Sequence, residues 1–142
     1  MNIAGREISK IGPGILVLLG VEKGDTEKEA RWMADKVSNL RIFEDECGKM
    51  NRSVIETGGA CMVVSQFTLL GDAKKGRRPS FERAEKAEAA KNLYKLFIAF
   101  LKEKGLVVRE GEFGAFMEIE LVNSGPVTMI LDTPSEEGEK GR

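Results

Sequence analysis

The chain contains no histidine and two cysteines among its 142 residues, and these two shortages exclude whole classes of site. A structural zinc ion takes four cysteine and histidine ligands, so the chain's own thiols and imidazoles are too few for one. A Ser-His or Cys-His pair, in which the imidazole activates the nucleophile, is excluded as well. We therefore expect no metal and no other cofactor.

An excess of charge of either sign is also missing. The 22 basic residues are balanced by 23 acidic residues, which gives a net charge of -1. Many nucleic-acid-binding domains carry a global basic field, and this chain does not. Contact with RNA must therefore come from a local patch. The densest basic run without interleaved acids is formed by Lys74, Lys75, Arg77 and Arg78.

Long hydrophobic runs are absent. No stretch approaches the roughly 20 apolar residues that span a bilayer, and the N-terminus is too polar for a signal peptide. Cys61 lies in a short apolar run and is expected in the core, whereas Cys47 lies in an acidic turn that disfavours its thiolate. Because no disulfide framework is indicated, we expect a soluble protein of the reducing cytoplasm.

The spacing of apolar residues predicts an α+β domain. One helix is predicted from residues 24–26 to 39, opened by a capping box of Thr26 and Glu29. A second is predicted over 82–104, with Ser80 as its N-cap and a single apolar stripe. Short strands are predicted over 5–11, 15–19, 41–43, 61–64, 106–108, 116–122 and 127–131, the first two as a hairpin. The length suits one domain, which we place at 1–132, followed by a disordered charged tail at 133–142.

The stretch from Cys61 to Phe81 combines a strand with a polar end and a basic loop. Its first four residues form an apolar run typical of a buried strand. Hydroxyl and amide side chains follow at the strand's end, and the basic cluster comes after a turn. This combination suits an anionic substrate with a reactive carbonyl. The alternative, which composition alone favours, is a strand followed by a solvated charge run.

Five blocks of the sequence resemble the D-aminoacyl-tRNA deacylase family. S-Q-F-T-L at 65–69, followed by K-G-R-R-P-S-F at 75–81, is similar to one family signature. N-S-G-P-V-T at 123–128 is similar to a second. Three further blocks, at 11–21, 39–51 and 113–117, also resemble the family, and all five follow in the family's order. Five blocks in register are far more specific than any one of them.

This resemblance implies a fold, an activity and a set of site residues. The implied fold is a barrel-like, mostly antiparallel sheet packed with two main helices, in a homodimer with its active site at the interface. The implied activity is hydrolysis of D-aminoacyl-tRNA, and of mischarged glycyl-tRNA, as chiral proofreading in translation. The implied partner is the aminoacylated end of tRNA, with no DNA and no membrane. The implied site residues are Ser65, Gln66, Phe67 and Thr68 for catalysis, Gly125, Pro126 and Met117 for substrate binding and chiral selection, and Lys74, Lys75, Arg77 and Arg78 for tRNA.

Chiral selection in the resembling family depends on the backbone of the Gly-Pro pair. The bond before that proline is cis there, and its carbonyls enter the partner subunit's site. They exclude the direction of an L side chain, whatever that side chain is. The resemblance implies this role for Gly125 and Pro126, whereas most Gly-Pro dipeptides are ordinary turns.

One element of the family is missing. Members usually begin with a further strand, roughly M-R-x-V-x-Q-R-V, before the segment that matches Asn2. Without it, we expect a neighbouring strand to present unpaired backbone groups at a sheet edge. We expect the difference to reflect a miscalled start or a fragment, with a true variant as the alternative.

The chemistry of an aminoacyl ester narrows the mechanism. The ester is already activated, and a threonine hydroxyl without a neighbouring base is a poor nucleophile. Our preferred hypothesis is that backbone N–H groups at Phe67 and Thr68 hold the carbonyl oxygen while the substrate's ribose hydroxyl assists water. Thr68 then orients the substrate, and the alternative is that Thr68 is the nucleophile. Two other functions stay open, a non-catalytic RNA-binding module and an inactive truncated family member.

Overall fold

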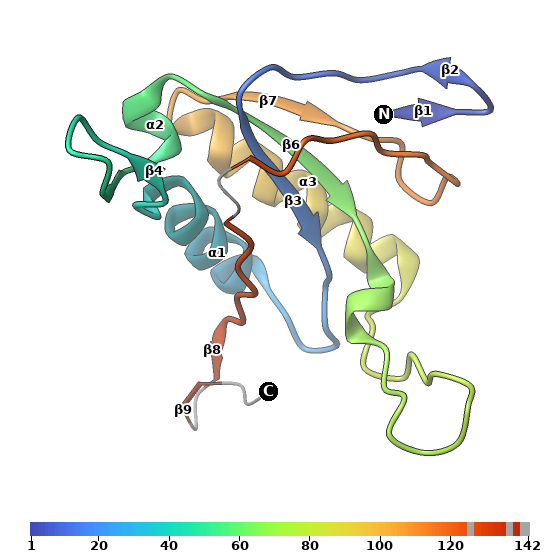
Figure 1. The fold of residues 1–142 in the computed structure, drawn as a ribbon. Helices are drawn as coiled ribbons and strands as arrows, with labels where there is room; N and C mark the ends of the chain where they lie inside the picture. Colours follow the sequence, from blue (N-terminus) through green and yellow to red (C-terminus); the bar gives the residue numbers. More distant parts are fainter. Residues whose placement is uncertain (125–126, 136–137, 140–142) are drawn as a thin grey trace.

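The computed structural model describes residues 1–124, 127–135 and 138–139, in which helices and short strands make an α+β domain (Figure 1). No helix in these ranges is both long enough and apolar enough to cross a membrane. The helical elements are α1 (Glu27–Asn39), α2 (Val54–Thr57), the 3₁₀ helix η1 (Phe67–Leu70) and α3 (Ala87–Glu103). The strands are β1 (Asn2–Ile3), β2 (Arg6–Glu7), β3 (Gly14–Leu19), β4 (Phe43–Glu44), β5 (Met50–Arg52), β6 (Ala60–Ser65), β7 (Val107–Glu110), β8 (Pro134–Ser135) and β9 (Gly138–Glu139).

The largest sheet is parallel and has three strands in the order β3-β6-β7. The register aligns Gly14 with Ala60 and Leu19 with Ser65, so β3 and β6 end at the same edge. Parallel neighbours need a crossover connection, which is usually helical. Here α1 and α2 lie within the connection from β3 to β6, and α3 lies within the connection from β6 to β7. The sequence thus alternates strand and helix where the sheet requires it.

The predicted barrel-like, mostly antiparallel sheet is wrong. The antiparallel pairs β1–β2, β4–β5 and β8–β9 have two strands each, and no sheet within the described ranges closes into a barrel. The predicted hairpin of 5–11 with 15–19 is also wrong, because β3 pairs with β6 instead. A continuous apolar run such as that of β3 is typical of a parallel strand covered on both faces, so the run itself fits the observed pairing better than the hairpin does.

The segment 116–122 shows the predicted alternation without becoming a strand. Met117 and Ile119 are half-buried, whereas Glu118 and Glu120 are exposed. Its backbone meets that of Asn2 at an isolated bridge, where Asn2 N donates to Glu118 O at 2.7 Å and Glu118 N donates to Asn2 O at 2.8 Å. Within the described ranges, neither 116–122 nor 127–131 belongs to a ladder. The alternation therefore reflects which side chains face the core.

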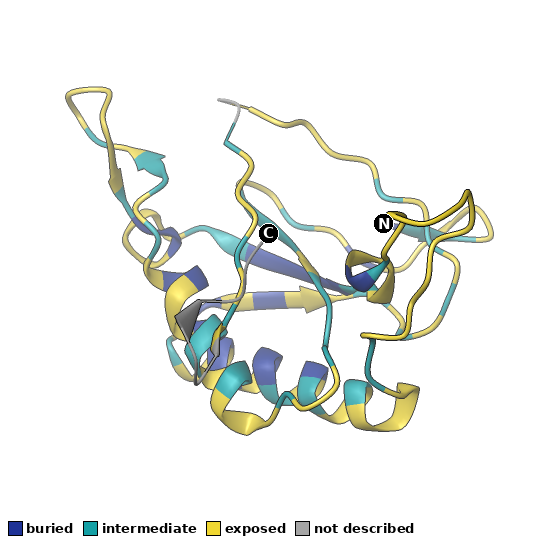
Figure 2. Ribbon diagram, turned by 90° about the horizontal axis from the view of Figure 1, so that it is seen from below, coloured by how far each residue is buried: buried dark blue, intermediate teal, exposed yellow. Residues whose placement is uncertain are grey.

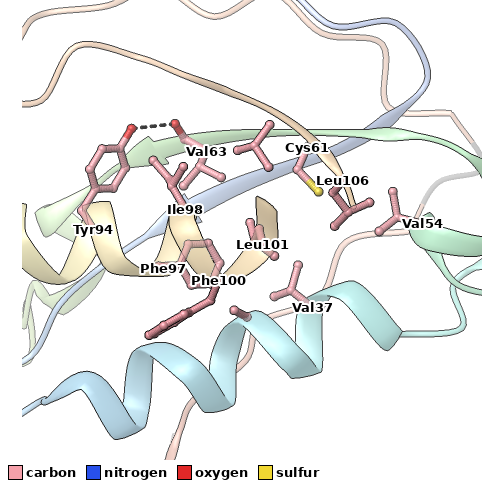
Figure 3. Close-up of a cluster of buried hydrophobic side chains, with 12 residues drawn as sticks. Val37, Val54, Cys61, Val63, Tyr94, Phe97, Ile98, Phe100, Leu101 and Leu106 are labelled. Atoms are coloured by element: carbon pink, nitrogen blue, oxygen red, sulfur yellow. Dashed lines mark hydrogen bonds between the residues drawn. The ribbon is translucent and has the colours of Figure 1, made fainter. Parts of the chain in front are cut away.

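Strand β6 is buried on both faces. Cys61 and Val63 point to the helices and pack with Phe97, Ile98 and Leu101 of α3 and with Val37 of α1 (Figure 3). Met62 and Val64 point to the opposite face, where Met1, Leu16 and Met117 cover them. Figure 2 shows the buried residues concentrated in this strand and on the inner sides of the helices. The strand that leads to the predicted catalytic residues is thus held from both sides.

The first main helix begins as predicted and the second does not. Thr26 N donates to Glu29 Oε2 at 2.8 Å at the start of α1, as a capping box requires. Helix α3 begins at Ala87 rather than at Glu82. The reason is that residues 81–85 run beside the segment after β3, where Lys23 N donates to Arg83 O and Glu85 N donates to Val21 O, both at 2.9 Å. These bonds hold 81–85 outside the helix.

Tyr94 should make stability fall at alkaline pH. Its hydroxyl is buried on α3 and donates to Val63 O at 2.9 Å. Burial, with the nearby charge of Glu110, raises the pKa of Tyr94 from 10.0 to about 12. Because the folded pKa lies above the unfolded one, the stabilisation is complete below pH 10 and is lost as the pH rises through 12.

The measurement is urea unfolding of the wild type and of Tyr94→Phe between pH 10 and 12. The variant should lose less stability across this window than the wild type. Burial also raises the pKa of the Cys61 thiol to about 11, but that thiol is present in both proteins, so the difference reports Tyr94. Equal losses in the two proteins would contradict the prediction.

Candidate active site

The predicted catalytic residues lie at the carboxyl ends of two neighbouring parallel strands. Ser65 ends β6 and is aligned with Leu19, which ends β3. The chain then turns, and Gln66 N donates to Leu19 O at 2.8 Å, which fixes the exit of β6 against the exit of β3. In open α/β sheets, ligands bind outside the carboxyl ends of the strands. The structure therefore brings Ser65 and Gln66 to an edge that is suited to binding.

The 3₁₀ helix η1 presents its side chains to solvent in a defined way. Leu70 is buried and packs against Gly20, the residue after β3. Phe67, Thr68 and Leu69 are exposed. Because Leu70 anchors the short helix, the other three side chains face outward from a fixed base. The sequence placed these residues at the end of a strand and did not predict the helical turn that orients them.

The hydroxyl of Thr68 is held by the side-chain amide of Gln66. Gln66 Nε2 donates to Thr68 Oγ1 at 2.5 Å. A nucleophilic hydroxyl needs a base that accepts its proton, and this partner is a donor. The chain also has no histidine that can take that place. The pair therefore favours Thr68 as an orienting group and supports the first of the two mechanisms derived from the sequence.

The first turn of η1 leaves backbone donors available. Helices of every kind begin with N–H groups that have no acceptor inside the helix. Gln66 O accepts from Leu69 N at 3.2 Å and Thr68 O accepts from Gly71 N at 3.0 Å, so the turn is closed from Gln66 onward. Among the described residues, no carbonyl outside η1 accepts from the N–H of Phe67 or Thr68. These two groups have the chemistry that a developing oxyanion requires.

The four predicted tRNA-binding cations lie together on one loop. This basic loop, residues 72–80, follows η1 and extends beyond the edge of the sheet (Figure 1). Asp72 and Ser80 close its base by two backbone hydrogen bonds of 2.7 Å, and Asp72 Oδ1 accepts from Lys74 N at 2.9 Å. Lys74, Lys75, Arg77 and Arg78 are all exposed. No ion pair among the described residues involves any of the four.

An aromatic contact joins the basic loop to η1. The rings of Phe67 and Phe81 pack edge to face, with centroids 5.2 Å apart and planes inclined by 71°. A Cβ placed on Gly71 would lie 2.9 Å from Phe81 Cε1, so the ring also covers the end of η1. Sequence reasoning assigned no role to Phe81. The available signal was an aromatic residue placed directly after the basic cluster in the R-R-P-S-F block.

The remaining predicted residues do not join this group within the described part of the chain. Met117 is half-buried and packs with Met62 and Val64 on the face of β6 opposite the helices. It therefore lies beside the strand that leads to Ser65. Gly125 and Pro126 lie outside the described residues, and their predicted roles, including the cis bond, stay predictions.

Comparison with known proteins identifies the family. The sequence model of the D-Tyr-tRNA(Tyr) deacylase family matches residues 1–132. The D-aminoacyl-tRNA deacylase of Shouchella clausii is 54% identical over 133 residues, which cover 94% of this chain and 91% of that protein. The one of Myxococcus xanthus is 52% identical over 141 residues, which cover 99% and 92%. The solved structure of the c-Myc DNA unwinding element binding protein is 41% identical, with a TM-score of 0.87, and the match covers 94% of this chain and 91% of that one. The chain belongs to the D-Tyr-tRNA(Tyr) deacylase family.

Proposed function

We propose that the protein hydrolyses the ester bond of D-aminoacyl-tRNA and of mischarged glycyl-tRNA, and thereby releases free tRNA and the amino acid as proofreading in translation. The observation that carries the proposal is the membership of the D-Tyr-tRNA(Tyr) deacylase family over 1–132. The arrangement at the edge of the sheet supports it, because available backbone donors at Phe67 and Thr68 stand beside a loop with four exposed cations. Such a substrate has both a carbonyl and phosphates. The place of action is the cytoplasm, where aminoacyl-tRNA is used.

The proposed mechanism is positional and electrostatic. The N–H groups of Phe67 and Thr68 donate to the ester carbonyl oxygen as negative charge develops on it. Water adds to the carbonyl carbon, with its proton passed to the neighbouring ribose hydroxyl of the substrate. The bond between the carbonyl carbon and the ester oxygen of the ribose then breaks, and this leaving oxygen takes the proton that the neighbouring hydroxyl relays from water. Gln66 fixes the hydroxyl of Thr68 so that it orients the substrate.

The mechanism predicts a modest effect of Thr68→Ala. Because the hydroxyl orients and does not attack, kcat on D-tyrosyl-tRNA should fall by no more than about tenfold, the cost of one lost hydrogen bond. Single-turnover kinetics measures this step directly. If all activity is lost while tRNA binding stays intact, or if an acyl-threonine is trapped, Thr68 is the nucleophile instead.

The homodimer is part of the proposal. Four exposed apolar residues lie on either side of 125–126 in the sequence, with exposed fractions of 60% for Leu121, 91% for Val122, 58% for Met129 and 71% for Ile130. Exposed apolar patches mark surfaces that another molecule covers, and two-fold homodimers are the commonest soluble oligomers, so we propose that a second copy covers these residues. In the proposed dimer, Gly125 and Pro126 of each subunit enter the active site of the partner. Sedimentation of the purified chain tests the dimer, and a fully active monomer would exclude it.

The experiment that tests the function compares D- and L-tyrosyl-tRNA as substrates. The wild type should hydrolyse the D-substrate and leave the L-substrate largely intact. Pro126→Ala frees the backbone φ angle that proline fixes and adds an N–H group, so the D-rate should fall and the preference for D over L should narrow. If Pro126→Ala keeps both the rate and the ratio, then Gly125-Pro126 is an ordinary turn. If the wild type binds tRNA without hydrolysis of either ester, the protein is an RNA-binding module.

A further inference from the structure

The basic loop is closed at its base and attached on both sides. On its N-terminal side it continues directly from η1 through Gly71. On its C-terminal side, residues 81–85 are tied to the segment after β3 by backbone hydrogen bonds at Val21 and Lys23. The guanidinium of Arg83 adds an ion pair with Glu22 at 2.6 Å. The stem after the loop is therefore fixed to the sheet, whereas the cationic tip forms no ion pair with any described residue.

Phe81 is the residue at which these parts meet. It follows Ser80, the last residue of the basic loop, and is the first residue of the tied segment 81–85. Its ring contacts Phe67 at the start of η1 and lies against Gly71 at the end of η1. Thr68 lies between these contact points in the sequence, and the N–H group of Phe67 belongs to the first of them. We therefore expect a shift of the loop base to move the Phe81 ring, and with it the turn that carries Phe67 and Thr68.

Packing for stability alone does not account well for this contact. Phe67 and Phe81 are 57% and 36% exposed, so a substantial part of the pair stays in contact with solvent. The edge-to-face arrangement, however, fixes the relative orientation of the two rings. An exposed pair of rings with a fixed relative orientation, at the junction of a binding loop and a reactive turn, can transmit a movement of the loop to the turn.

We propose that Phe81 is a positioning residue that couples phosphate contacts at the basic loop to the orientation of Phe67 and Thr68. This inference rests on the proposed function, since it concerns the same reaction. When the tRNA backbone binds Arg77 and Arg78, the base of the loop takes up one fixed position. The Phe81 ring then holds η1 with its N–H groups toward the carbonyl. Loop contacts then contribute to the chemical step as well as to binding.

A double-mutant cycle tests the coupling. The proteins are the wild type, Phe81→Leu, the double variant Arg77→Ala/Arg78→Ala, and their combination, with kcat and KM measured on D-tyrosyl-tRNA. Phe81→Leu should lower kcat about tenfold, with a smaller change in KM. The effect of the loop substitutions on kcat should largely disappear in the Phe81→Leu background. Phe81→Tyr keeps the ring and should retain kcat.

A small substrate separates coupling from simple damage. On the D-tyrosyl ester of adenosine, which lacks the acceptor-stem phosphates, the loop substitutions should have no effect on kcat, while Phe81→Leu still lowers it. Phe113→Leu is the matched control, because it removes a ring from a second aromatic pair, which Phe113 forms with Tyr94 of α3. On D-tyrosyl-tRNA, the factor by which Phe113→Leu lowers kcat should multiply with the factor for the loop substitutions, as independent changes do. Phe81→Met replaces Phe81→Leu if the latter does not fold.

The outcomes distinguish the coupling from the function itself. If the wild type does not hydrolyse the D-substrate, the proposed function fails. If the wild type is active but the effects of Phe81→Leu and of the loop substitutions on kcat multiply independently, the coupling is overturned and the function stands. Loss of kcat in Phe81→Tyr equal to that in Phe81→Leu also overturns it, because the ring is then not what positions η1.

Discussion

Replacing Phe97 with alanine is expected to lower the free energy of unfolding by about 3–5 kcal/mol. Phe97 lies on α3 and is 1% exposed. Its ring sits between the parallel sheet and α1, among Val37, Val63 and Leu101 (Figure 3). Alanine there leaves a cavity that the surrounding strands and helices can fill only in part. Since whole domains are stable by about 5–15 kcal/mol, this single change should bring the protein close to unfolding.

Urea denaturation followed by circular dichroism measures this effect. Met50→Ala is the matched control, because Met50 is a large apolar side chain on β5 that is 62% exposed. The control should change the unfolding free energy by no more than about 0.5 kcal/mol. A loss below about 1 kcal/mol for Phe97→Ala would mean that the interface between α3 and the sheet is not the main core.

Changing Lys74, Lys75, Arg77 and Arg78 together to glutamate is expected to abolish most tRNA affinity. Each reversal should weaken binding several-fold, and the four together by roughly 100-fold or more at low salt. The four side chains are exposed on a loop that is closed by backbone bonds at Asp72 and Ser80, so the fold should survive. The slope of log K against log salt should fall by about one for each phosphate that the loop no longer neutralises.

A control with the same change in net charge isolates the position of the cations. Lys28, Lys91, Lys95 and Lys102 are exposed on α1 and α3, and none of them forms an ion pair with another described residue. Changing these four to glutamate should weaken binding much less at physiological salt, because screening acts over about 8 Å. Equal losses in the two quadruple variants would mean that only the overall charge matters. An unchanged salt slope in the loop variant would remove the loop from the RNA interface.

Local signals in the sequence predicted local structure well. The capping box of Thr26 and Glu29 marks the start of α1, and the apolar run from Cys61 to Val64 marks the buried strand β6. Both depend on neighbouring residues alone. The start of α3 was wrong because backbone bonds from Val21 and Lys23 compete for residues 81–85, and these partners are distant in the sequence.

The sequence pattern did not predict how the strands pair with one another. The runs in β3 and β6 are apolar on both faces, which is typical of parallel strands but also occurs in the core of antiparallel sandwiches. The resemblance supplied an antiparallel barrel, whereas the pairs Gly14–Ala60 and Ala60–Val107 are parallel. The S-Q-F-T motif was enough to predict which residues form the site, but not how these residues are arranged in space. The anchoring of Leu70 against Gly20 and the bond from Gln66 to Thr68 arise only once β3 and β6 end side by side.

The central position of β6 in the sheet has a consequence for folding during synthesis on the ribosome. Its first partner, β3, is synthesised well before it, and its second partner, β7, is synthesised only after the whole of α3. Pairings between such distant segments make folding slow. During synthesis, the apolar residues of β3 have no neighbouring strand until β6 has been made. Strand β6 then has one unpaired edge until β7 emerges. Exposed strand edges of this kind promote aggregation. We therefore expect the nascent chain to depend on chaperones until Val107–Glu110 has left the exit tunnel.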